Sequence, residues 1–204
     1  MKPDHVHQYL ERAGTIPHRT EGEAVLVEHL PPQAGRVLDL GTGNGRLAAI
    51  VLDARPRCDV VAVDFSPAML DSARERFAAD ARVEVAEHDL DDSLPAAWGR
   101  FDAVVSSFAI HHVSDVRKAA LYAEVATHLH AGGAFLNLEH VSSPTEALHR
   151  EFMQAMGSTT EDPSNHLASV DDNLEWMREA GLVDVDCAWK WRELALLVGR
   201  SPQA

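Results

Sequence analysis

The chain has 204 residues, of which 32 are acidic and 18 basic, giving a formal net charge of −14. This length suffices for one domain with its own core, and the acidic balance disfavours attraction to nucleic-acid phosphates or to an anionic membrane. We therefore expect a small-molecule partner, with no nucleic acid and no membrane.

The compartment is indicated by the first segment and by the cysteines. Charges interrupt MKPDHVHQYLERAG where a signal peptide would have its apolar core, and no apolar run approaches the ~20 residues of a membrane span. Only Cys58 and Cys187 are present, in separate segments and without metal-ligand spacing. These features predict a cytoplasmic protein. They leave open whether it is a monomer or a homodimer.

Apolar runs of strand length alternate with helical patterns along most of the chain. Amphipathic stretches at 3–13 and 20–30 come first and predict a helical cover over residues 1–35. The predicted strands are residues 36–40, 60–63, 83–86, 103–106 and 134–138. The predicted helices are residues 45–54, 67–78 and 116–130, the last stopped by Gly132-Gly133. This alternation predicts a doubly wound, Rossmann-like α/β fold with a mostly parallel sheet.

Near the end of the chain, two strand-like runs follow each other with only a short polar link at 190–192 between them. These runs, VDVDCAW and ELALLVGR, predict an antiparallel hairpin that completes a seven-stranded sheet. Trp189 and Trp191 share one face of this hairpin, which favours structural cover or a dimer contact over substrate stacking. Residues 142–172 have a weaker pattern and predict a lid-like insertion, a helix followed by a loop. We expect one domain over residues 1–204.

A glycine-rich turn in VLDLGTGNGRLA, residues 37–48, lies between the first strand and the first crossover helix. In a doubly wound sheet this turn lies at the ligand site. A dinucleotide fingerprint would need glycine where this chain has Arg46, and a phosphate loop would need a lysine after the glycines. Asp39 would repel a pyrophosphate and attract a cation. These differences disfavour an NAD(P)-dependent oxidoreductase, which stays as the weaker alternative enzyme.

The turn resembles the first motif of class I S-adenosylmethionine-dependent methyltransferases, an acidic residue followed by G-x-G-x-G. Asp39, Gly41, Gly43 and Gly45 match it position for position. The resemblance implies that this turn, with Thr42, holds S-adenosylmethionine, whose product is S-adenosylhomocysteine. This cofactor carries no phosphate, so the glycines would serve close approach of the backbone.

Further motifs extend the resemblance over roughly residues 36–200. In VVAVDFSPAML, the resemblance implies that Asp64 accepts hydrogen bonds from both ribose hydroxyls, with Phe65 and Met69 in apolar contact with the adenine or ribose. FDAVVSSFAIHHV resembles the fourth-strand motif and places Ser106 at the cofactor. LHAGGAFLNLEH resembles the turn and fifth strand that follow it.

AEHDLDD, residues 86–92, resembles the motif that binds the adenine edge. The resemblance implies that Asp89 receives the exocyclic amine, with the backbone of His88 and Leu90 nearby. Arg19, in TIPHRTEGE, could pair with the cofactor carboxylate or an acidic substrate, or remain solvated.

Methyl transfer is an in-line displacement, so the protein supplies alignment and a base when the nucleophile carries a proton. His111 follows the fourth strand and His140 the fifth, and we expect both to act on the substrate. His112 is a weaker candidate that could face inward, and both adjacent histidines could instead cap or pack. Glu139 could orient the substrate or, with His111 and His140, bind a divalent metal, but the favoured interpretation has no metal.

The sequence thus predicts a methyltransferase acting on a small molecule, with a bias towards an oxygen or nitrogen nucleophile because a histidine base would help either. Residues 106–109 lack the N-P-P-Y type of tetrapeptide, which argues against a nucleic-acid base amine as the target. The non-enzyme alternative is a catalytically silent, cofactor-binding partner subunit.

Overall fold

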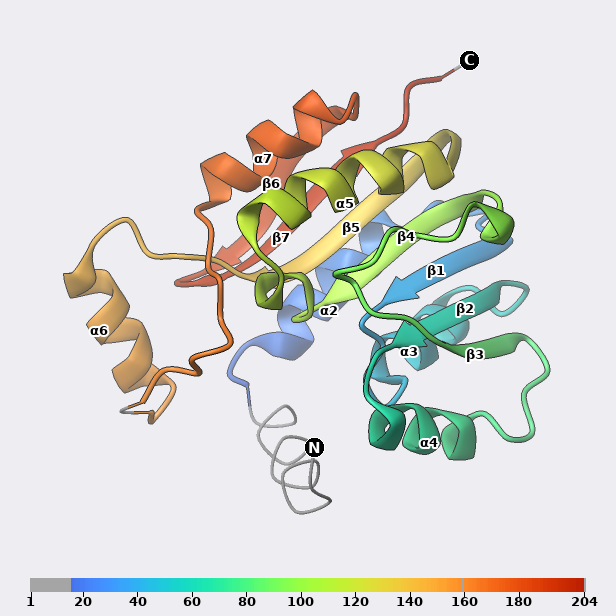
Figure 1. Ribbon diagram of the computed structural model, residues 1–204, viewed down its shortest axis with the longest axis horizontal. Helices are drawn as coiled ribbons and strands as arrows, with labels where there is room; N and C mark the ends of the chain where they lie inside the picture. Colours follow the sequence, from blue (N-terminus) through green and yellow to red (C-terminus); the bar gives the residue numbers. More distant parts are fainter. Residues whose placement is uncertain (1–15, 159, 204) are drawn as a thin grey trace.

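The computed structural model describes residues 16–158 and 160–203, and its centre is a seven-stranded sheet in the order β3-β2-β1-β4-β5-β7-β6 (Figure 1). Strands β1 to β5 pair in parallel, and β7 pairs antiparallel with both β5 and β6. The predicted α/β fold with its closing hairpin is confirmed. The predicted helical stretch at 3–13 lies outside the described residues.

The elements follow the predicted runs closely. The strands are β1 Arg36–Leu40, β2 Asp59–Asp64, β3 Val83–Glu87, β4 Phe101–Ser107, β5 Leu129–His140, β6 Val183–Trp191 and β7 Leu194–Arg200. The helices are α2 Arg19–His29, α3 Arg46–Ala54, α4 Pro67–Arg76, α5 Asp115–His128, α6 Glu146–Ala155 and α7 Val170–Glu179, with short 3₁₀ turns η1 Ala96–Trp98 and η2 Ile110–His112.

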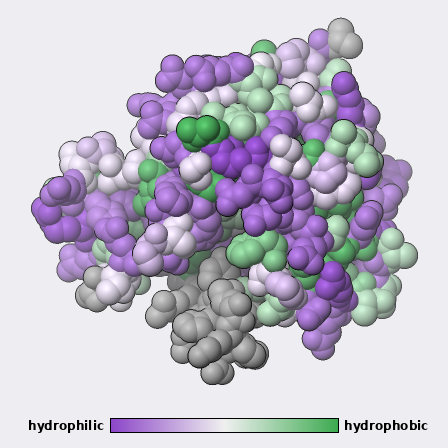
Figure 2. Space-filling view, viewed as in Figure 1, coloured by the Kyte–Doolittle hydropathy of each residue, from purple (hydrophilic) through white to green (hydrophobic). Residues whose placement is uncertain are grey.

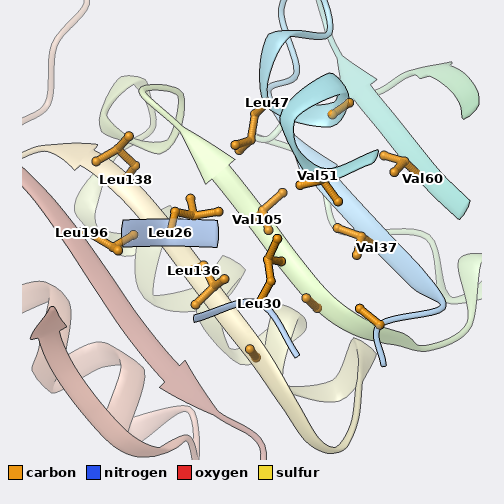
Figure 3. Close-up of a cluster of buried hydrophobic side chains, with 14 of the residues drawn as sticks. Leu26, Leu30, Val37, Leu47, Val51, Val60, Val105, Leu136, Leu138 and Leu196 are labelled. Carbon is orange, nitrogen blue, oxygen red and sulfur yellow. The ribbon is translucent and has the colours of Figure 1, made fainter. Parts of the chain in front are cut away.

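Helices cover both faces of the sheet. Helices α2 and α3 pack on one face, where leucines and valines from the helices interdigitate with those of the strands (Figure 3). Helices α5 and α7 pack on the other face, which buries a second apolar cluster (Figure 1). The central strands are therefore buried on both sides, which explains why their sequences are continuous apolar runs.

The prediction that Gly132-Gly133 stops the helix is wrong. Helix α5 ends at His128, and Leu129 is already extended and begins β5, in register with Phe101. The side chain of Leu129 is 1% exposed, so burial against the sheet favours strand over another helical turn. The two glycines instead coincide with a register shift between β5 and β4, where the strand needs an irregular backbone.

The turn of the hairpin and the start of the insertion both lie at the carboxyl end of β5, where His140 pairs with Leu194 and Val141 N donates to the carbonyl of Glu193. Trp189 packs against Gly22 of α2, where an added Cβ would lie 3.0 Å from its ring, so the predicted role in structural cover is confirmed for this side chain. Helix α6 stands at the end of the sheet, and the chain returns from it to α7 (Figure 1). The insertion does contain the predicted helix; that it acts as a lid stays a prediction.

Polar side chains dominate the face that α5 and α7 present to solvent (Figure 2). None of the helices in the described ranges has both the length and the apolar character required to cross a bilayer.

Candidate functional site

The glycine-rich turn after β1 is held by hydrogen bonds to β1 itself and to β2. Thr42 N donates to the carbonyl of Val63 at 2.8 Å, and the Thr42 hydroxyl donates to Asp39 Oδ2 at 2.6 Å. Gly43 N donates to Asp64 Oδ2 at 2.9 Å. The turn therefore spans the carboxyl ends of β1 and β2, the edge where doubly wound sheets bind ligands.

Two glycines of this turn serve different purposes. Gly41 has a φ of 68°, and a Cβ there would lie 2.1 Å from the Cβ of Ala109, so only glycine allows the turn to approach the segment after β4. Gly43 has a φ of 56°, but a Cβ there would meet no described atom within 4 Å. The side of the turn at Gly43 is therefore open to a ligand, while Gly41 brings the histidine-bearing segment close.

Asp39 is a fully buried carboxyl group, and its Oδ1 has no hydrogen-bond partner among the residues that the structure describes. Burial raises its pKa to about 7; the hydrogen bond from Thr42 opposes the rise and the charge of Asp64 adds to it. A cation beside Oδ1 would favour the ionised form. This end of β1 therefore suits a positively charged ligand.

Asp64 ends β2 and connects the glycine turn to α4. Its Oδ1 accepts from Ser66 N at 2.8 Å and its Oδ2 from Gly43 N at 2.9 Å, and burial raises its pKa despite these bonds. Each oxygen keeps acceptor capacity for a further donor. Beside it, Phe65 is 62% exposed whereas Met69 is buried, so Phe65 is the more available of the two for contact with a planar ligand.

The segment after β3 lies next along the same edge. His88 packs its ring edge-on against Trp98 at 5.1 Å, and its Nε2 is buried without a described partner. Burial lowers the pKa of His88, which favours the neutral ring. Asp89 Oδ1 accepts from Asp91 N at 3.0 Å, which shapes the turn, and Leu90 is buried beneath it.

Ser106 is fully buried in β4, and its hydroxyl donates to the carbonyl of Leu40 at 2.9 Å. The side chain thus joins β4 to β1 within the sheet. The side chain is buried, so contact of Ser106 with a cofactor, which stays a prediction, would have to come from its backbone.

Arg19 lies against the site and is only 12% exposed, so the alternative of a solvated arginine is wrong. Its Nε donates to Glu23 at 2.9 Å, and its Nη2 donates to the hydroxyl of Ser107 at 3.3 Å. Glu23 also receives two bonds from Arg46, both of 2.7 Å. Sequence reasoning missed Glu23, although its i, i+4 spacing from Arg19 was a usable signal.

His111 and Glu139 form the closest ionisable pair of the site. His111 Nδ1 lies 2.5 Å from Glu139 Oε1, and the two side chains are 8% and 2% exposed. Burial opposes ionisation of Glu139, but the charge and hydrogen bond of His111 and the backbone N–H of His140 together hold its pKa below the usual value. Because a carboxylate only accepts, Nδ1 is the nitrogen that carries the proton when the ring is neutral, and Nε2 is then the nitrogen that can accept one.

His112 faces the return stretch of the insertion. Its Nδ1 lies 3.1 Å from the hydroxyl of Ser164 and 3.3 Å from that residue's carbonyl oxygen. Next to it, the carbonyl of His111 accepts from His166 N at 2.8 Å. Burial, followed by the charge of His111, lowers the pKa of His112. Its observed role is packing, and it also helps to hold the insertion.

His140 is the second predicted catalytic residue, and the structure places it beside the first. The rings of His111 and His140 are 5.6 Å apart, and His140 Nε2 lies 3.0 Å from Glu193 Oε2. Within the described ranges, no three His, Cys, Asp or Glu side chains are grouped so that they could hold a metal ion.

These features agree with comparisons to known proteins. A family model described as a methyltransferase domain matches residues 37–133. A demethylmenaquinone methyltransferase from Clavibacter sepedonicus is 32% identical over 173 residues, covering 76% of this chain and 69% of that protein. The chain belongs to the S-adenosylmethionine-dependent methyltransferase family. S-adenosylmethionine is therefore its cofactor, and the buried carboxyl of Asp39 fits a ligand that carries ammonium and sulfonium charges.

Other relatives of this methyltransferase are named for different acceptors. A ubiquinone/menaquinone biosynthesis C-methyltransferase (UbiE) from Desulfotalea psychrophila is 35% identical over 60% of this chain and 48% of its own length. A ribosomal RNA small subunit methyltransferase C from Shewanella oneidensis is 34% identical over 46% of this chain and 27% of its own length. The chain thus spans about half, or less, of these two relatives.

A solved O-methyltransferase family protein from Burkholderia thailandensis has the same fold as this methyltransferase. The TM-score is 0.73 at 24% sequence identity, and the match covers 92% of this chain and 57% of that one. At this identity the likeness concerns the fold, so the acceptor must be inferred from the residues of the site.

Proposed function

We propose that this protein transfers the methyl group of S-adenosylmethionine to an oxygen or nitrogen atom of a small molecule, with His111 as the base. The observation that supports this is the bond between His111 Nδ1 and the buried Glu139 carboxylate, which leaves Nε2 as a proton acceptor. When bound, S-adenosylmethionine supplies an electrophilic methyl group. A hydroxyl or ammonium group must lose a proton to attack it, and a base positioned by a carboxylate meets that need.

The residues proposed to hold the cofactor come from the carboxyl ends of the strands and from α2. Asp39 would attract its cationic groups, and Asp64 would accept hydrogen bonds from its ribose. The other proposed contacts are Arg19, Gly41, Thr42, Gly43, Gly45, Phe65, Met69, His88, Asp89, Leu90 and the backbone of Ser106.

Proton transfer is assigned to the two histidines that follow β4 and β5. His111 Nε2 would accept the proton of the acceptor, and Glu139 would stabilise the imidazolium that results. His140, whose ring lies 5.6 Å from that of His111, would contact the same acceptor. The in-line geometry then depends on how firmly these rings are held.

A carbon acceptor is the second candidate, favoured by the relative from Desulfotalea psychrophila, which is named a C-methyltransferase. A ribosomal RNA target is disfavoured by the net charge of −14, which repels a polyanion. A cytoplasmic location belongs to the same proposal and is supported by the two free cysteines, Cys58 and Cys187.

The test is methyl transfer from carbon-13-labelled S-adenosylmethionine to panels of phenols, amines, quinols and ribosomal RNA. The chemical shift of the labelled methyl group identifies the acceptor atom. We expect an oxygen or nitrogen product that His111→Gln greatly reduces. The control His130→Gln, at an exposed histidine at the start of β5 and so at the opposite end of the strand from His140, should leave it unchanged. A carbon-bound methyl would overturn the acceptor assignment, and unchanged turnover in His111→Gln would overturn the base. Tight cofactor binding without any product would favour the silent partner subunit.

A further inference from the structure

A fully buried carboxylate lies at the turn between β6 and β7. Glu193 accepts hydrogen bonds from His140 Nε2 at 3.0 Å, from His149 Nδ1 at 2.8 Å and from the Ser143 hydroxyl at 2.5 Å. Its backbone carbonyl accepts from Val141 N at 2.8 Å. Burying a carboxylate is costly unless such bonds compensate, and none of these contacts holds the cofactor turn. The arrangement needs another explanation.

His149 connects Glu193 to the insertion. Its Nδ1 faces Glu193, and its Nε2 lies 2.7 Å from Glu161 Oε1 in the loop after α6. Because carboxylates only accept, both ring nitrogens must carry protons, and the ring is an imidazolium. The hydrogen bond to Glu193 raises the pKa of His149; partial burial opposes the rise and Glu161 adds to it. We call Glu193, His149 and Glu161 the latch.

Through His149, the latch joins α6 to the turn between β6 and β7. Phe152, one turn after His149 on the same helix, is 2% exposed, and its ring lies 5.2 Å from that of His140 and 6.1 Å from that of Trp191. Trp191 in turn stacks on His18 at 4.4 Å. Fastening α6 therefore seats an aromatic side chain over the second histidine of the acceptor site.

We infer that Glu193 is a positioning residue, which orients His140 directly and fastens α6 over it through protonated His149. The inference deepens the proposed function and rests on it for the acceptor site, but the latch can be tested without turnover. When the His149 imidazolium loses a proton, only one of its ring nitrogens can still donate, so the contact with either Glu193 or Glu161 is lost and α6 is released. An exposed pair between Arg192 and Glu151, at 3.3 Å, also joins the hairpin to α6, but neither of its groups ordinarily titrates near neutral pH. Two histidines face Glu193, His140 from β5 and His149 from α6, and of these two His149 is the one that connects the carboxylate to α6 and to Glu161.

The sign of the pH dependence follows from the raised pKa of His149. The stabilisation of α6 by the latch is complete below the ordinary histidine pKa of about 6.5. It is lost as pH rises through the higher pKa of His149 in the folded protein. Hydrogen exchange of α6, corrected for intrinsic rates, should therefore slow at mildly acidic pH and quicken at alkaline pH. Helix α4, which packs against β2 and β3, serves as the internal reference.

The decisive experiment compares hydrogen exchange of Glu146–Ala155 in the wild type, Glu193→Gln, His149→Gln and Glu151→Gln. We expect weak protection at every pH in the first two variants and a wild-type pH response in Glu151→Gln, which removes only the exposed pair. Nitrogen-15 NMR of labelled histidines should show His149 protonated at neutral pH. Equal protection of α6 in the wild type and His149→Gln, or a neutral His149 at pH 6, would overturn the latch. If Glu193→Gln does not fold, His149→Gln carries the same test.

The positioning role is tested separately once an acceptor is known. We expect Glu193→Gln to raise the KM for the acceptor roughly tenfold, as for one lost charged hydrogen bond, with a smaller change in kcat and unaltered cofactor affinity. His149→Gln should raise the same KM and remove its pH dependence. Unchanged acceptor KM in both variants would overturn the role. A protein that binds cofactor and has a working latch but no turnover would instead overturn the proposed function.

Discussion

His111 Nδ1 and Glu139 Oε1 lie 2.5 Å apart, and this contact joins the segment after β4 to the buried end of β5. We expect Glu139→Gln to reduce kcat roughly 10- to 1,000-fold with little change in cofactor affinity, because the amide can hold the wrong tautomer of His111. Steady-state kinetics with isothermal titration of the cofactor would measure both. Glu87→Gln, an exposed glutamate at the end of β3, is the control. Equal losses in the two variants would contradict a specific role of Glu139.

Cofactor binding should take up or release protons because the pKa of Asp39 is raised to about 7 by burial. A cationic ligand favours the ionised carboxylate, so affinity should rise as pH increases through about 7, with proton release below it. Calorimetric titration at pH 6.5 in buffers of different ionisation enthalpy measures the protons released. Asp39→Asn should abolish the buffer dependence. Identical heats in all buffers for the wild type would contradict the assignment.

Gly41→Ala should destabilise the fold by about 2–4 kcal/mol, since it adds a contact 2.1 Å from Ala109 to the cost of a positive φ. Gly181→Ala is the matched control, because that residue also has a positive φ but an added Cβ there meets no described atom within 4 Å. We expect the control to lose only about 1 kcal/mol. Urea denaturation gives both values, and similar losses would show that the approach to Ala109 can relax.

Glu23→Gln should cost about 1–3 kcal/mol, because a buried carboxylate that holds Arg19 and Arg46 loses its charge. Arg46 is 38% exposed, which keeps the loss below that of a fully buried triad. Glu21→Gln, whose side chain is 62% exposed and pairs with His18, should lose less than about 0.5 kcal/mol. Thermal unfolding of the two variants side by side would reveal whether the buried network stabilises α2.

The positions of the residues proposed to bind the cofactor could be predicted from the sequence because these residues lie in or directly after short strands. Asp39, the glycines and Asp64 occur within local patterns whose spacing fixes their place at one edge of the sheet. The pairing of His111 with Glu139 was only partly predictable: both were singled out, but their contact depends on the register of β4 with β5.

The surroundings of His140 depend on contacts that no local pattern indicates. Glu193 occupies a polar turn in the sequence, which is typical of an exposed side chain, yet the structure buries it completely. Its burial results from α6 packing over the hairpin, and the sequence between 142 and 172 does not say where that helix lies. Gly132-Gly133 was misjudged for a similar reason, because pairing with β4 outweighed a local helix-stop signal.

The place of β7 between β5 and β6 affects the order in which contacts form during synthesis of the chain. Gly43 and Asp64 are 21 positions apart, whereas His140 and Glu193 are 53 positions apart, and contacts between distant positions close more slowly. During synthesis the earlier segments emerge first. The contact between Gly43 and Asp64 can therefore form before the hairpin has been synthesised. The contact between His140 and Glu193 forms only when the hairpin is in place.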